Sequence, residues 1–115
     1  MNEIKKLTDQ IIKFRDARDW KQFHNPKDLA LSLTLESTEV LEHFQWKTPE
    51  EIEKYLKTDK GHIGEELADV MYWILLMSYD LNIDIKKALL EKMKQNEKKY
   101  PVHKVKGSHK KYTEL

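Results

Sequence analysis

Apolar residues return at helical spacing along most of the chain. Ile4, Leu7, Ile11 and Phe14 lie three or four residues apart, and this amphipathic pattern predicts a helix over residues 2–18. The period is then lost for a few residues and returns further on. Only three glycines and three prolines interrupt the chain, and no stretch shows the alternation that is typical of a strand.

Helix start signals locate the remaining elements. Asn25 and Thr48 each stand directly before a proline, so that a capping side chain is followed by a residue favoured in the first turn. Glu51 stands three residues after Thr48, as a capping box requires, and Asp84 is a further cap. We therefore expect four more helices: from Pro26 to about Trp46, from Pro49 to about Thr58, over residues 62–81, and from Ile85 to about Tyr100.

These elements predict an all-α fold, a bundle of four to five helices. We expect residues 1–101 to form the helical domain and residues 102–115 to form a basic, irregular tail after Pro101. Hydrophobic residues make up 39% of the chain, which is modest for a domain of this size. A single copy would leave apolar helix faces uncovered, so we expect an oligomer that shares its core.

Charge and composition exclude several classes of partner. The 21 Lys and Arg residues nearly balance the 20 Asp and Glu residues, so no overall field favours nucleic acid or membranes. The longest apolar run, Val70 to Met77, is too short to span a bilayer. The chain has no cysteine, which excludes disulfides and thiolate chemistry. Its N-terminus lacks the apolar core of a signal peptide, and we expect a soluble cytoplasmic protein.

Two short acidic motifs are the strongest chemical signal. Glu36-Ser-Thr-Glu39 and Glu66-Leu-Ala-Asp69 each place two carboxylates three residues apart, which puts them side by side on one helix face. Both motifs interrupt apolar runs, where an unneutralised charge is costly. Either motif alone is typical of a solvated or salt-bridged helix, but the two together favour a shared site.

A divalent cation would relieve the repulsion among four clustered carboxylates. An all-oxygen ligand set favours Mg²⁺, Mn²⁺ or Ca²⁺ over zinc. A ferritin-like di-iron site needs Glu-x-x-His, and none of the five histidines stands three residues after a glutamate. A glycosidase-type carboxyl pair fits the spacing, although a small all-α domain offers little cleft for a sugar chain.

Other residues have the chemistry to complete a phosphate site. Lys92 and Asn96 lie four residues apart, so they share a helix face and could contact a triphosphate, or simply form a solvated polar face. Trp20 and Trp46 offer aromatic surfaces for a base, and core or interface packing is the alternative for Trp46. His24 fits a base contact and a local role at the helix entry equally well.

Further motifs follow one another in order along nearly the whole chain. They are Arg18-Asp-Trp20, Gln22-Phe-His24-Asn-Pro26, Phe44-Gln-Trp46-Lys47, Lys92-Met-Lys-Gln-Asn96, Tyr100-Pro101 and Lys111-Tyr-Thr-Glu-Leu115. Together with ExxE followed by ExxD, this series resembles the MazG-like all-α nucleoside triphosphate pyrophosphohydrolases, and more closely their dCTP pyrophosphatase branch. Many MazG-like chains begin the first motif with two glutamates, whereas Leu35 precedes Glu36 here. The single glutamate favours the dCTP branch.

The resemblance implies an activity and a site. The four motif carboxylates would bind Mg²⁺, with Mn²⁺ as a substitute, and Glu36 or Glu39 would take a proton from the attacking water. Lys92 and Asn96 would contact the phosphates, and the base would be held by Trp20, His24 and Trp46. The family hydrolyses nucleoside triphosphates to the monophosphate and pyrophosphate, in cleansing of the nucleotide pool.

Two rival functions come from other classes. A non-catalytic helical module would bind protein partners through its apolar faces and would need no metal. A nucleic-acid binder would use the basic tail with Tyr112, but four lysines in that tail, partly offset by Glu114, give this reading little support. Metal-dependent nucleotide hydrolysis is the function that the sequence favours.

Overall fold

The structure, a computed structural model, describes residues 2–115. It divides into two compact units, Met1–Asn82 and Ile83–Leu115. The first contains α1 (Glu3–Ala17), the 3-10 helix η1 (Lys21–Phe23), α2 (Pro26–Glu42) and α3 (Pro49–Asp80); the second contains α4 (Ile85–Lys99), α5 (Val102–Val105) and the 3-10 helix η2 (Tyr112–Glu114). The described residues form helices and no strands, and the predicted all-α fold is confirmed.

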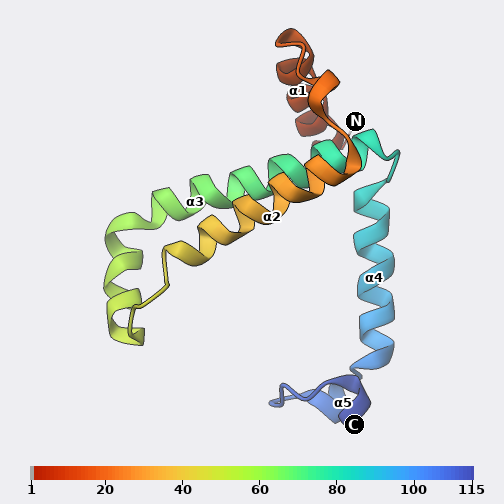
Figure 1. The fold of residues 1–115 in the computed structure, drawn as a ribbon. Helices are drawn as coiled ribbons and strands as arrows, with labels where there is room; N and C mark the ends of the chain where they lie inside the picture. The colour runs from red at the N-terminus through yellow and green to blue at the C-terminus, as the bar shows by residue number, and fades with distance from the viewer. Residues whose placement is uncertain (1) are drawn as a thin grey trace. The chain divides into compact units, whose positions relative to one another are not determined.

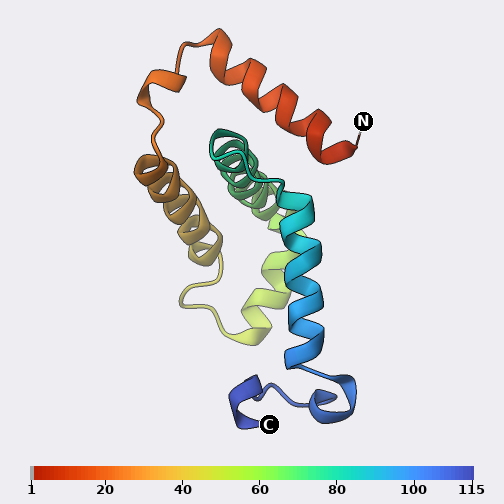
Figure 2. The ribbon, with the colours of Figure 1, turned by 90° about the vertical axis from the view of Figure 1, so that its right-hand side faces the viewer.

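The core of the first unit lies along α3. Helix α2 runs antiparallel to α3, and α1 packs against the same long helix (Figure 1). Leu29 of α2 and Ile63, Leu75 and Leu76 of α3 are buried, as expected where the apolar faces of two amphipathic helices pack together. Figure 2 shows the chain passing from α1 through η1 into α2. This α2–α3 pair carries both acidic motifs.

Helix α2 ends at Glu42, four residues before the predicted end at Trp46. The chain turns instead: Phe44 N and Gln45 N both donate to Leu41 O, and Trp46 adopts a φ of 69°. A left-handed residue cannot continue an α-helix. The turn therefore ends α2 and leads the chain to the cap of α3.

Helix α3 includes two segments that the sequence pattern predicts as separate helices. The expected break between Thr58 and residue 62 is a kink at Asp59, where φ is −118° and ψ is 15°. Thr58 Oγ1 donates to Asp59 Oδ2 at 2.7 Å, and His62 Nδ1 lies 3.3 Å from Asp59 Oδ1. The two predicted helices are thus the two arms of one bent helix, and the capping box predicted at Thr48 and Glu51 is present at its start.

The second unit begins at a predicted cap. The Asp84 side chain accepts a hydrogen bond from Lys87 N at the start of α4. In the segment predicted to be irregular, α5 and η2 are short helical turns, and Tyr112 packs edge-on against Tyr100 with ring centroids 6.0 Å apart. The division into a domain of residues 1–101 and a tail of residues 102–115 stays a prediction. No described helix is long and apolar enough to cross a membrane.

Candidate metal and nucleotide site

The two acidic motifs meet where α2 packs along α3. One carboxylate oxygen from each of Glu36, Glu39, Glu66 and Asp69 lies within 4.8 Å of the other three. Glu36, Glu39 and Glu66 are half-buried, and Asp69 is exposed at the edge of the cluster. The convergence that the spacing predicted is therefore present in the fold.

Four negative charges are energetically unfavourable in the environment of these carboxylates. Burial, followed by the neighbouring Glu39, Asp69 and Glu66, raises the pKa of Glu36, and one of its oxygens, Oε2, is buried without a hydrogen-bond partner. Hydrogen bonding with Glu39 and burial raise the pKa of Glu66. Both effects arise because like charges are held together in a partly dry place.

A divalent cation fits this donor set. Each carboxylate contributes an acceptor oxygen, the unpartnered Glu36 Oε2 has a lone pair to offer, and the ligands converge from two rigid helices. Hard cations prefer such oxygen ligands and would cancel the mutual repulsion. The cluster can therefore hold a metal ion.

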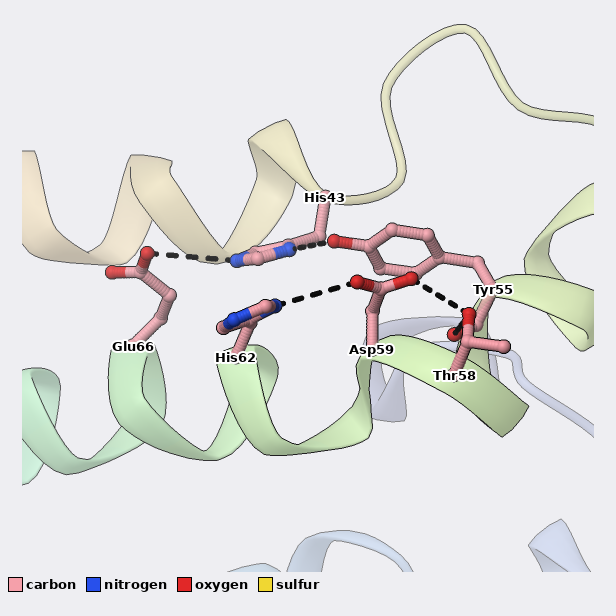
Figure 3. A network of polar contacts seen from close by, with 6 residues as sticks. All are labelled: His43, Tyr55, Thr58, Asp59, His62 and Glu66. Atoms are coloured by element: carbon pink, nitrogen blue, oxygen red, sulfur yellow. Dashed lines mark hydrogen bonds and ion pairs between the residues drawn. The ribbon is translucent and has the colours of Figure 1, made fainter.

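A polar network that the sequence analysis did not identify adjoins the cluster (Figure 3). His43, at the end of α2, places Nε2 3.5 Å from Glu66 Oε1, while its Nδ1 contacts the hydroxyl of Tyr55. A signal was present in the sequence: His43 lies four residues after Glu39 and seven after Glu36, and these spacings put all three side chains on one helix face.

An apolar pocket of about 660 Å³ opens beside the carboxylates. Glu36 and Asp69 reach its wall, and aromatic side chains form much of its lining: Phe14, Trp20, Tyr72 and Trp73. The rings of Phe14 and Trp20 meet edge-on with centroids 5.7 Å apart. A pocket with aromatic walls and a few polar groups at one end is typical of small-molecule sites.

The other predicted base contacts occupy different environments. His24 packs edge-on against Trp73 with centroids 5.6 Å apart; burial and then the charge of Arg15 lower its pKa, and its Nδ1 is buried without a hydrogen-bond partner. Trp46 is 91% exposed in the turn after α2. Of the three candidates, Trp20 lines the pocket, and the base-binding role of all three stays a prediction.

The predicted phosphate contacts lie in the second unit. Lys92 and Asn96 are exposed on α4, one helical turn apart and therefore on a common face. This arrangement agrees with the spacing argument, and their contact with a triphosphate stays a prediction.

Comparison with known proteins identifies the class. The MazG-like family model matches residues 31–115, and the chain belongs to the MazG-like family. Two relatives, dCTP pyrophosphatase 1 of Bos taurus and of Homo sapiens, are each 38% identical over 104 residues, which cover 89% of this chain and 62% and 61% of theirs. The chain thus spans about three fifths of the length of these curated relatives.

A solved structure extends the comparison to the fold. The crystal structure of a pyrophosphatase from Archaeoglobus fulgidus superposes with a TM-score of 0.82 and 38% sequence identity. The match covers 88% of this chain and 94% of that one. Nearly the whole of that protein therefore shares the fold of this chain.

Proposed function

We propose that this protein hydrolyses (deoxy)nucleoside triphosphates, with dCTP or a modified dCTP as the preferred substrate, to the monophosphate and pyrophosphate. The observation that carries the proposal is the carboxylate cluster at the end of an aromatic pocket. The family membership and the names of the relatives support the same chemistry. Its role would be cleansing of the nucleotide pool, and a cytoplasmic location fits that role.

The four motif carboxylates would hold Mg²⁺, with Mn²⁺ as a substitute. When bound, the cation would supply charge for the triphosphate oxygens and lower the pKa of a coordinated water. Glu36 or Glu39 would accept the proton of the attacking water. The raised pKa of Glu36 reflects the metal-free cluster, and bound cations would lower it again.

The nucleoside would enter the aromatic pocket, with Trp20 stacking on the base. In the same proposal His24 and Trp46 contact the base, and Lys92 and Asn96 contact the phosphates. Trp46 is so exposed that the surrounding residues of its own chain cannot form an enclosed site for a base with it. Its exposure favours a site that a second copy completes, and we propose a homodimer or homotetramer.

Exposed apolar side chains support assembly as well. Those on the paired helices that carry the acidic motifs include Leu31, Leu35, Leu41 and Leu67. A monomer would leave this apolar area in water at a cost of about 25 cal/mol per Å². The same observation favours the second candidate function, a non-catalytic helical module that binds protein partners.

Product analysis tests the proposal. A panel of dNTPs, NTPs and 5-methyl-dCTP would be incubated with the protein, with and without Mg²⁺, and the products separated by ion exchange. We expect the monophosphate and pyrophosphate, dependent on Mg²⁺ and fastest with a cytosine nucleotide. Glu36→Gln should lose turnover, whereas Glu65→Gln, which changes an exposed carboxylate of α3 that lies outside the cluster, should keep it.

Each other outcome has a definite meaning. The same products with a different preferred base would keep the reaction and reject the substrate. Turnover that survives removal of metal and the Glu36→Gln change would reject the metal site. A well-folded protein that turns over none of these nucleotides would favour the partner-binding module.

A further inference from the structure

His43 connects the two arms of the bent helix α3 at the metal cluster. Tyr55 lies on the arm before the kink at Asp59, and Glu66 lies on the arm after it. The His43 ring reaches both, with Nδ1 at the Tyr55 hydroxyl and Nε2 3.5 Å from Glu66 Oε1 (Figure 3). The His43 side chain is 13% exposed, so solvent competes little for these contacts.

The hydrogen-bond donors and acceptors of Tyr55, His43 and Glu66 match along the network. An ionised carboxylate only accepts hydrogen bonds, and a neutral imidazole has one donor and one acceptor nitrogen. If Nε2 carries the proton toward Glu66, Nδ1 is the acceptor and the Tyr55 hydroxyl must donate to it. Burial and the nearby carboxylates of Asp59 and Glu66 raise the pKa of Tyr55, which keeps the phenol protonated and able to donate.

The carboxylate of Glu66 then has one oxygen toward His43 and a second directed away from it (Figure 3). The second oxygen is available to bind a cation in the cluster. Metal ligands are commonly oriented in this way by neighbouring hydrogen-bond donors, and loss of such a neighbour weakens metal binding about 10- to 100-fold.

We propose that His43 is a positioning residue for the metal site: Tyr55 fixes its Nε2–H tautomer, and that N–H orients Glu66 toward the cation. The proposal rests on the metal site of the proposed function. It adds the requirement that the bend at Asp59 brings Tyr55 and Glu66 to the two sides of one imidazole.

Mn²⁺ binding to the full chain, followed by electron paramagnetic resonance, tests the proposal. His43→Leu should weaken Mn²⁺ affinity about 10- to 100-fold, and Tyr55→Phe should weaken it in the same direction by a smaller factor. His43→Gln, whose amide N–H stands near the place of Nε2, should recover most of the loss. His103→Leu is the matched control, because His103 is an exposed histidine of α5 that is not part of the acidic cluster.

Two readouts separate positioning from simple packing. The double variant His43→Leu/Tyr55→Phe should bind Mn²⁺ no more weakly than His43→Leu alone, because Tyr55 acts through His43. The ¹⁵N resonances of His43 should report the Nε2–H tautomer, and Tyr55→Phe should change them. Additive losses, or an Nδ1–H tautomer, would overturn the proposal.

The outcomes also distinguish this proposal from the proposed function. Unchanged Mn²⁺ affinity in His43→Leu and Tyr55→Phe, with nucleotide hydrolysis intact, would reject the positioning role alone. A wild-type protein that binds no Mn²⁺ and hydrolyses no nucleotide would reject both. If His43→Leu does not fold, the conservative variants His43→Gln and Tyr55→Phe carry the test, and equal affinity in Tyr55→Phe and wild type would overturn it.

Discussion

The buried guanidinium of Arg15 donates from Nη1 to Oδ2 of Asp80 at 2.7 Å. Arg15 is 1% exposed, and the pair joins α1 to the last residue of α3. Although burial acts to lower the pKa of Arg15, its hydrogen bonds and charge contacts with Asp80 and Asp16 raise it overall. This ion pair therefore holds one wall of the aromatic pocket, which is lined from α1 and α3.

Arg15→Met should destabilise the protein by about 3–5 kcal/mol, because it leaves the Asp80 carboxylate without its partner in a mostly dry place. Urea unfolding followed by circular dichroism measures the change. Lys5→Met is the control, since Lys5 forms an exposed pair with Asp9 at 4.0 Å and such pairs contribute about 0–1 kcal/mol. Equal losses in the two variants would contradict the role given to Arg15.

Local signals in the sequence were sufficient for the helices and for the carboxylate cluster. The caps at Asn25, Thr48 and Asp84 accept the hydrogen bonds expected of them, because capping depends on residues within one turn. The ExxE and ExxD spacings predict a common face on each helix, and packing of α2 along α3 brings the two faces together.

Contacts between residues that lie far apart in the sequence could not be predicted from these local signals. Helical periodicity shows which face of α2 carries His43, but the neighbours on that face depend on the bend at Asp59 and on the register between the helices. The partner Tyr55 is twelve residues away in sequence. The end of α2 was also predicted too late, since the left-handed φ of Trp46 has no sequence signal of the kind that glycine gives.

Glu39→Gln should affect stability in opposite directions with and without metal. In the metal-free protein it removes a charge that repels Glu36 and Glu66, so the melting temperature should rise. In wild type, Mg²⁺ at about 100 times its Kd should add about 2.7 kcal/mol, and the variant should lose most of that gain.

Thermal unfolding at pH 7.5 with a magnesium titration measures both effects. Glu42→Gln is the matched control, because it removes an exposed carboxylate of the same helix that lies outside the cluster. A Glu39→Gln protein that gains as much from Mg²⁺ as wild type would reject Glu39 as a ligand.

His24 should make the protein less stable as the pH falls. Its pKa is lowered below 6.5 by burial and by Arg15, so the unfolded chain takes up the proton before the folded one does. The contribution of neutral His24 is complete above pH 6.5 and is lost as the pH falls from 6.5 through the lower folded pKa.

Urea unfolding at a series of pH values between 5 and 8 measures this slope. The variant His24→Asn, which cannot titrate in this range, should show a flatter dependence than wild type over the same window. Identical slopes in the two proteins would mean that burial of His24 does not control this part of the pH profile.

Replacement of Trp46 should leave the fold as stable or more stable and should weaken substrate binding. It combines a left-handed φ of 69° with 91% exposure; the backbone conformation costs about 1–2 kcal/mol for a residue other than glycine, and little packing offsets it. Trp46→Gly should therefore be as stable as wild type or more stable, while the KM for dCTP rises about 10- to 100-fold through loss of a stacking surface.

Urea unfolding and steady-state kinetics measure the two effects, with Leu41→Ala as an exposed apolar control. A Trp46→Gly protein with unchanged KM would show that Trp46 has no part in binding the base.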